Sequence, residues 1–410
     1  MTMAPLTARP AVSAGVLMTC AVLCAALGMG LRNSFGLFLA PMTEANLWTA
    51  SGFSLAIAVQ VLVNGISQPI CGQFADRYGG RVVVFVGAGI YFVGILGMAL
   101  AGSLGIFSAF AGPLMGVGVS AAGLPVIIST LTRLLPESMR GRAAGLGTAG
   151  SSFGQFLVVP AAGFGIAQFG WQPTMIAMAV AGLLMIPLAM VLAEPPRPKV
   201  AAASEETAKE ALARAFRTPT FWFLFFGFFV CGLHVSFLTT HLPGFVHSCG
   251  LPVAVGAGAI GIIGLFNVAG SLGAGELTQR WRRRDLLVII YASRGVLMTW
   301  FVLADKTTTT VMVFSAFMGI LYLSTVPPTI ALVARNFGTR WLATLFGLVF
   351  LGHQLGGFTG AYLGGVVLDR TGNYDLMWWI GVAGAAFAAL LHLPVKDPEL
   401  PRAPQAVGAR

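Results

Sequence analysis

Apolar runs long enough to cross a lipid bilayer recur along the whole chain, from Val12 to His392. The hydrocarbon core of a bilayer is about 30 Å thick, so a helix needs about 20 mostly apolar residues to cross it. Of the 410 residues, 57% are hydrophobic and 9% are charged, whereas a typical soluble domain has about 25% charged residues. These features predict a polytopic membrane protein. They exclude soluble enzymes, nucleic-acid-binding proteins and secreted disulfide scaffolds.

Hydropathy predicts twelve transmembrane helices and therefore an all-α fold. The predicted spans are 12–40, 50–72, 82–101, 105–131, 143–166, 172–193, 219–243, 254–276, 286–304, 310–332, 340–366 and 375–395. A long polar stretch, Glu194 to Pro219, separates six spans from six. We therefore expect a six-helix bundle at 1–193, a cytoplasmic linker at 194–218 with a short amphipathic helix on the membrane surface, a second bundle at 219–395 and a tail at 396–410.

The distribution of the 24 Lys and Arg residues predicts the orientation in the membrane. If the N-terminus is cytoplasmic, Arg32 and Arg294 fall inside spans, and only Lys306 and Arg370 fall on the outer side. Cytoplasmic loops of membrane proteins carry an excess of basic residues. We therefore expect both termini and the linker in the cytoplasm.

The two halves of the chain overlay at an offset of 202–203 residues. The matches are Gly72, Arg77 and Arg81 with Gly275, Arg280 and Arg284; Gly116 and Pro125 with Gly319 and Pro328; and Gly145, Gly150, Gly154 and Phe156 with Gly347, Gly352, Gly356 and Phe358. Duplicated six-helix halves are a common plan among secondary transporters, whose substrate site lies near mid-membrane between the repeats. The repeat predicts two pseudo-symmetric bundles with a central site.

The loop between the second and third spans reads Gly72-Gln-Phe-Ala-Asp76-Arg77-Tyr-Gly79-Gly80-Arg81. Glycine permits tight turns and close helix approach, and an aspartate can pair with a basic residue or a helix N-terminus. The segment resembles the cytoplasmic-loop signature of the major facilitator superfamily, which implies the major facilitator fold. We expect its residues to latch the inner ends of the bundles in one state of a transport cycle: Gly72, Asp76, Arg77, Gly79 and Arg81.

A closer resemblance covers nearly the whole chain. It is carried by the stretches at 34–38, 227–234, 240–243, 264–267 and 353–356. These stretches are similar to bacterial members of the monocarboxylate transporter family, which implies a bacterial inner membrane as the location. The resemblance implies that a cation on span one, close to Arg32, and a polar residue on span eight, Asn267, contribute to substrate binding.

None of the 14 Asp and Glu residues lies deep in a predicted span. The interior charged or titratable groups are Arg32, Arg294, His234, His241 and His353. A charge at mid-membrane costs at least about 2.5–3.5 kcal/mol, so each requires a reason. The interior is positive without a protein carboxylate to neutralise it, which predicts an anionic substrate.

Arg32 on span one is the first candidate to bind a substrate carboxylate, through two parallel hydrogen bonds. The alternative is an arginine that extends to the outer interface or bonds backbone carbonyls. Asn33 could add a hydrogen bond. Arg294 on span nine either contacts the ligand or bridges to a neighbouring span. Three further polar residues either line a central cavity or bond between helices: Tyr322, Gln60 and Asn64.

The histidines are candidates for proton coupling, because histidine titrates near neutral pH. His234 and His241 are seven residues apart on span seven and so share a helix face, and His353 precedes Gln354 on span eleven. The alternative role for each histidine is structural, as a side chain that forms a hydrogen bond between helices.

We therefore expect a secondary transporter of small organic anions, foremost monocarboxylates, that works by alternating access with proton symport. Its partners would be the anion, a proton and the lipid bilayer, and it would function as a monomer without nucleic acid, metal or cofactor. The alternative is a proton-coupled exporter of drugs or other lipophilic compounds. Zinc-protease, nucleophile-elbow and P-loop motifs are absent from the sequence, so we expect no enzyme and no catalytic residues.

Overall fold

Every regular element in the described part of the chain is a helix. The structure is a computed structural model that describes residues 13–134, 137–192, 208–338 and 341–397. In these ranges, eleven helices are long and apolar enough to cross a membrane. The remaining predicted span, 340–366, corresponds to α17 (Leu342–Thr371). It packs along α12 and α3 and completes the second bundle.

The spans of each half follow one another in chain order. The first half contains α1 (Ala14–Asn33), η1 (Phe35–Phe38), α2 (Leu39–Asn46), α3 (Ala50–Tyr78), α4 (Gly80–Ala99), α5 (Leu104–Ala109), η2 (Phe110–Leu114), α6 (Met115–Ala121), α7 (Leu124–Leu134), α8 (Glu137–Phe169), α9 (Trp171–Gly182) and α10 (Met185–Val191). After α11 (Ala208–Phe216), the second half contains α12 (Pro219–Ser248), α13 (Val253–Arg280), α14 (Arg283–Leu303), α15 (Thr308–Tyr322), α16 (Val326–Phe337), α17 and α18 (Asp375–His392).

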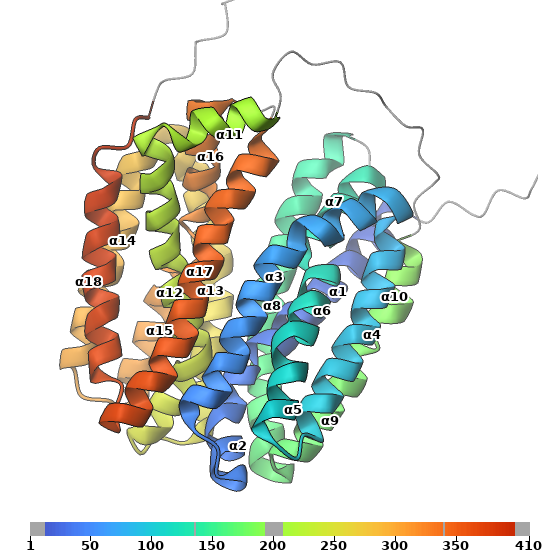
Figure 1. The fold of residues 1–410 in the computed structure, drawn as a ribbon, viewed down its shortest axis with the longest axis vertical. Helices are drawn as coiled ribbons and strands as arrows, with labels where there is room; N and C mark the ends of the chain where they lie inside the picture. Colours follow the sequence, from blue (N-terminus) through green and yellow to red (C-terminus); the bar gives the residue numbers. More distant parts are fainter. Residues whose placement is uncertain (1–12, 135–136, 193–207, 339–340, 398–410) are drawn as a thin grey trace, which may run out of the picture.

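The two halves form two bundles that lie side by side (Figure 1). The bundles meet along two pairs of helices, α3 with α17 and α8 with α13. Within each bundle the same close contact recurs at repeat-related positions. A side chain at Gly154 would overlap the carbonyl of Ala26, and one at Gly356 would overlap the carbonyl of Phe229. Small residues let helix backbones approach closely in a membrane. The predicted all-α fold of two pseudo-symmetric bundles is confirmed, whereas the exact domain boundaries stay a prediction.

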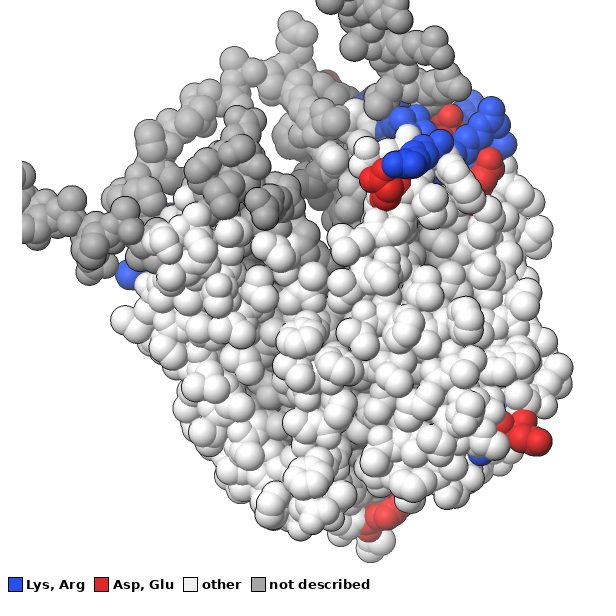
Figure 2. Space-filling view, turned by 180° about the vertical axis from the view of Figure 1, so that it is seen from behind, with Lys and Arg blue, Asp and Glu red and all other residues white. Residues whose placement is uncertain are grey.

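One end of the molecule carries α11, the start of α1 and the end of α10, and we call it the α11 end (Figure 1). The opposite end carries α2, and we call it the α2 end. The helix α11 lies within the predicted linker, with Ala211 and Ala215 buried and Lys209 and Arg217 exposed, as expected of an amphipathic helix. In Figure 2, Lys and Arg gather mainly at the α11 end, and the band between the two ends is uncharged on the visible face.

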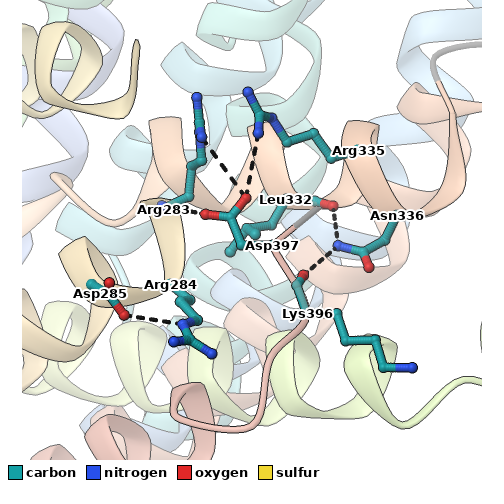
Figure 3. Close-up of polar contacts among 8 residues, drawn as sticks. All are labelled: Arg283, Arg284, Asp285, Leu332, Arg335, Asn336, Lys396 and Asp397. Atoms are coloured by element: carbon teal, nitrogen blue, oxygen red, sulfur yellow. Dashed lines mark hydrogen bonds and ion pairs between the residues drawn. The ribbon is translucent and has the colours of Figure 1, made fainter. Parts of the chain in front are cut away.

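The segment after α18 is held to the start of α14 and the end of α16 (Figure 3). The side chain of Asp397 is 3% exposed, and its Oδ2 accepts a hydrogen bond of 2.6 Å from the backbone nitrogen of Arg283. Its Oδ1 lies 3.6 Å from Nη1 of Arg335 and 3.9 Å from Nη1 of Arg283. Asn336 adds a hydrogen bond of 2.9 Å to the carbonyl of Lys396. One carboxylate therefore pairs with two guanidinium groups that are themselves mostly buried.

We expect Asp397→Asn to destabilise the protein by about 3 kcal/mol, because removal of one partner leaves buried charge uncompensated. The measurement is the melting temperature of the detergent-solubilised protein. Glu276→Gln is the matched control, because its ion pair with Arg280 is mostly exposed and contributes less than about 1 kcal/mol. Equal shifts for the two variants would contradict the prediction.

Candidate functional site

A cavity of about 780 Å³ lies between the two bundles. Its walls come from α1, α3, α4 and α6–α8 on one side and from α12, α13 and α15–α17 on the other. Toward the α11 end the lining includes Gln68, Ser129 and Ile330, and toward the α2 end it stops near Gly36 and Thr240. Among the described residues that line it there is no Asp or Glu. The lining of the cavity is mostly apolar, and the cavity extends toward the α11 end.

Two spans break where they meet this cavity, although each was expected to be continuous. The fourth span stops at Ala121 and resumes at Leu124, and the tenth stops at Tyr322 and resumes at Val326. Residues at both breaks line the cavity. Discontinuous helices are typical of transporter sites, because their free backbone groups can only be accommodated beside a cavity. The signal in the sequence was the repeat-related pair Pro125 and Pro328, one after each break. A hydropathy average over a whole span does not detect a single proline.

Arg32 lies on the cavity wall, one residue before the end of α1. The structure gives its guanidinium no hydrogen bond or ion pair with any described residue. The titratable groups near enough to interact with it electrostatically are Tyr91 and Tyr322, which are neutral at physiological pH. Tyr91 and Tyr322 donate their own hydroxyl protons to the carbonyls of Gly28 (2.9 Å) and Val235 (3.2 Å). Arg32 is thus a partly exposed cation without a counter-charge in the described site.

The other predicted binding residues divide between the cavity and the bundle interface. Asn33 and Tyr322 line the cavity, but the Asn33 amide donates to Oε1 of Gln155 at 2.7 Å. Gln155 in turn donates to the carbonyl of Ile260 in the other bundle at 2.8 Å. Asn267 is 3% exposed and joins the bundles through Nδ2 to Oγ of Ser152, at 3.0 Å. It is not part of the cavity lining. Gln155 had not been expected from the sequence.

Arg294 lies in the core of the second bundle rather than on the cavity. It is 1% exposed and donates to the carbonyls of Leu321 (2.5 and 3.2 Å) and Tyr322 (2.6 Å). Its guanidinium also lies 5.3 Å from the centre of the Tyr291 ring. Cations at helix C-termini stabilise the free carbonyls there. Of the two roles considered for Arg294, the geometry favours a bridge to the end of α15.

The three candidate histidines lie in different surroundings. Nε2 of His234 bonds the carbonyl of Gly381 at 2.8 Å, and Nε2 of His241 bonds the carbonyl of Ala361 at 2.7 Å. Neither lines the cavity. His353 does line it, and its ring stacks on Phe350 with the centroids 5.5 Å apart. Its Nδ1 lies 3.2 Å from Oε1 of Gln354, and Gln354 donates to the carbonyl of Val61 across the bundle interface.

The predicted gating loop joins α3 to α4 at the α11 end. Gly79 has a φ of +89°, a conformation that favours glycine, and α4 begins directly after it. Arg77 and Arg81 flank this turn, and Gly72 has open space beside it. The side chain of Asp76 lies outside the described part of the structure. The turn itself is therefore described, but the expected pairing of Asp76 is not.

The bundles are in close contact toward the α2 end. A side chain at Gly36, in η1, would overlap the carbonyl of Thr239, in α12. The carboxylate of Asp369, near the end of α17, accepts hydrogen bonds from the backbone nitrogens of Ala50 (3.0 Å) and Ser51 (2.7 Å) at the start of α3. A carboxylate at a helix N-terminus is favoured by the helix dipole. These contacts close the cavity toward the α2 end.

Comparison with known proteins identifies the family of the chain. The family model of the Major Facilitator Superfamily matches residues 18–357 and 259–409. The chain belongs to the Major Facilitator Superfamily. It is a membrane transporter, and the proteins of this family are transporters rather than enzymes. In the described residues no cluster of three or more His, Cys, Asp or Glu side chains could hold a metal ion.

The relatives span most of the transporter. It is 25% identical to the uncharacterized MFS-type transporter YcxA of Bacillus subtilis over 90% of this chain and 92% of that protein. It is 25% identical to mouse monocarboxylate transporter 11 over 85% of this chain and 80% of that protein, and 24% identical to the oxalate:formate antiporter of Oxalobacter formigenes over 81% and 82%. The xylose transporter XylE from E. coli shares the fold, with a TM-score of 0.68 at 14% identity over 92% of this chain and 98% of that one.

Proposed function

We propose that the protein is a secondary transporter that moves small organic anions, foremost monocarboxylates, across the plasma membrane by alternating access. The observation that carries the proposal is Arg32: it lines the cavity between the bundles, and no described carboxylate neutralises it. A guanidinium binds a carboxylate through two parallel hydrogen bonds, and the interaction is strengthened away from water. Arg32 is the one Lys or Arg among the described lining residues. Asn33 and Tyr322 would contribute from the same wall.

The names of several relatives support an anionic substrate. They include monocarboxylate transporters 11 and 13 and an oxalate:formate antiporter, all at about a quarter identity. These names agree in the carboxylate group and differ in the rest of the molecule. They therefore support the class of substrate rather than one compound.

The basic residues at the α11 end support a cytoplasmic position for that end, with both termini and the linker inside. In this orientation the cavity is open to the cytoplasm and closed outside by η1, α12 and the Asp369 contact. Alternating access would move the bundle at 1–193 against the bundle at 219–395, with the loop of Gly72, Asp76, Arg77, Gly79 and Arg81 closing the inner side. We propose a monomer in a bacterial inner membrane.

Proton symport would run through His353. It is the one of the three candidate histidines that lines the cavity, and its Nε2 has no hydrogen-bond partner in the described residues. It is also linked through Gln354 to the other bundle. A proton on His353 would therefore change both the charge beside the cavity and a contact between the bundles. Transport of one proton with one monocarboxylate is electroneutral.

The test is uptake into proteoliposomes across a panel of lactate-like and aromatic monocarboxylic acids, with and without an inward proton gradient. We expect at least one acid to accumulate, with the gradient raising uptake about tenfold per pH unit at equilibrium, because one proton moves with each anion. His353→Gln should retain anion exchange but lose the response to the gradient. His241→Gln is the matched control, because His241 is a buried histidine away from the cavity.

The proposal is contradicted if no carboxylate enters under any gradient. Proton-driven movement of a lipophilic drug in the same vesicles would instead support the exporter alternative. Exporters of cationic drugs generally use an acidic residue inside the membrane, and the described cavity lining has none.

A further inference from the structure

Three amides follow one face of α3 along the cavity. Gln60, Asn64 and Gln68 are four residues apart in sequence, so their side chains lie one above another on the helix. All three line the cavity. Gln60 is 1% exposed and Asn64 is 6% exposed, so these two are enclosed by protein, whereas Gln68 is only partly buried toward the α11 end. A buried polar side chain is unfavourable unless it is hydrogen-bonded. The amide atoms of Gln60 and Asn64 that have no protein partner therefore indicate where a ligand could bind.

Neighbouring groups determine how the two buried amides are oriented. Gln60 donates from Nε2 to the carbonyl of Ala111 at 3.0 Å, so its Oε1 is the atom without a partner in the described residues. The hydroxyl of Ser120 lies 2.7 Å from the backbone carbonyl oxygen of Asn64 and 2.9 Å from its Oδ1, and it shares its one proton between these two acceptors. The Nδ2 group of Asn64 has no partner among the described residues. An amide oxygen only accepts hydrogen bonds and an amide nitrogen only donates them. The wall of α3 therefore offers the cavity one acceptor and, one turn away, one donor.

Counted along the helices, Gln60 is as far from the α11 end as Arg32, and Asn64 is one turn closer to that end. Arg32 comes eighteen residues after the start of α1, and Gln60 comes eighteen residues before the end of α3, and both of these helix ends face the α11 end. At about 1.5 Å per residue, each lies about 27 Å along its helix. Side chains at positions i and i+4 are about 6 Å apart, so one hydroxyl oxygen between Gln60 and Asn64 can reach both at about 2.9 Å.

We propose that Gln60 and Asn64 form a second subsite that binds a hydroxyl group of the substrate, so that the preferred substrates are hydroxy carboxylates. The proposal rests on the proposed function, in which Arg32 holds the carboxylate. A hydroxyl donates to Oε1 of Gln60 and accepts from Nδ2 of Asn64, satisfying both. A keto oxygen accepts only and leaves the Gln60 oxygen unpaired. An ammonium group donates only and would add a second cation to a cavity already lined by Arg32.

The experiment measures dissociation constants of purified protein for matched acids: lactate against propionate, and 3-phenyllactate against 3-phenylpropionate. We expect wild-type protein to bind each hydroxy acid about tenfold more tightly than its partner, because the hydroxyl completes two hydrogen bonds. Gln60→Leu and Asn64→Leu should each reduce this ratio toward one. Gln172→Leu is the matched control: Gln172 donates to the carbonyl of Ala99 at 3.0 Å but does not line the cavity.

The outcomes separate the two proposals. If no acid binds to wild-type protein, the proposed function fails, and the subsite fails with it. If acids bind and Arg32→Gln abolishes binding, but wild-type protein does not prefer the hydroxy acids, the subsite alone is wrong. It is also wrong if the preference persists in both leucine variants. The preference of wild-type protein for hydroxy acids is measured without any substitution. The proposal can therefore be contradicted even if the leucine variants do not fold.

Discussion

We expect Arg32→Gln to weaken the binding of carboxylates strongly while the protein remains folded. The substitution removes the cation that lines the cavity and disrupts no bond between described residues, because the guanidinium has none. Truncating one partner of a desolvated charge pair costs about 2–5 kcal/mol, so the dissociation constant should rise about 30-fold or more. The measurement is a thermal-shift assay against carboxylates. A ligand at about 100 times its dissociation constant adds about 2.7 kcal/mol to wild-type stability, and the same ligand concentration should add less than about 1 kcal/mol to the stability of the variant.

Arg294→Gln is the contrasting variant. Arg294 bonds the carbonyls of Leu321 and Tyr322 and does not line the cavity. We therefore expect a lower melting temperature without ligand but a preserved shift on adding ligand. Loss of the shift in the Arg294 variant alone would reverse the assignment, and an unchanged shift in the Arg32 variant would remove the basis for an anionic substrate.

We expect Gly36→Val to stop transport, because it prevents closure of the α2 end. A Cβ at Gly36 would overlap the carbonyl of Thr239 and lie 2.9 Å from that of Thr240, so η1 and α12 could no longer touch. The contact is between backbone atoms of η1 and α12, which cannot move aside as a flexible side chain can. The variant should fold, because separating the two bundles at this end relieves the overlap, but uptake should fall to background. Proteoliposome uptake measures this loss.

A labelling experiment reports the conformation directly. In protein from which the five native cysteines have been removed, Ser236→Cys places a thiol on the cavity wall. A membrane-impermeant thiol reagent added from the α2 side should label it faster in the Gly36→Val background. Gly89→Val is the matched control, because a side chain at Gly89 meets no atom within 4 Å. Normal uptake by Gly36→Val, or equal labelling in both backgrounds, would show that this contact does not control access.

The large features of the fold were predictable because they depend on averages over many residues. Mean hydropathy located the spans, and the repeat with its offset of 202–203 residues indicated two related bundles. The breaks after Ala121 and Tyr322 were not predicted, because the segments stay apolar across them. Hydropathy indicates whether a segment lies in lipid or in water. It does not indicate where the backbone hydrogen bonds of a helix end.

The roles of individual polar residues were less predictable. Arg32 and Arg294 are both arginines inside apolar spans, yet one lines the cavity and the other bonds the end of α15. The histidines show the same division, because His353 lines the cavity whereas His234 and His241 bond carbonyls in the second bundle. The rotation of each helix about its axis decides which direction a side chain takes, and only packing against neighbours sets that rotation.

The sequence by itself determined that the chain crosses a membrane as two related sets of helices, and that positive groups lie inside with no acid deep among them. Those conclusions follow from the transfer of apolar and charged groups between water and lipid, which depends on composition along the chain. The tertiary structure decided which cation faces the cavity, which amide atoms of Gln60 and Asn64 remain free, and which end is closed. These depend on contacts between residues far apart in sequence, such as Asp369 with Ala50, that arise only when the two bundles meet.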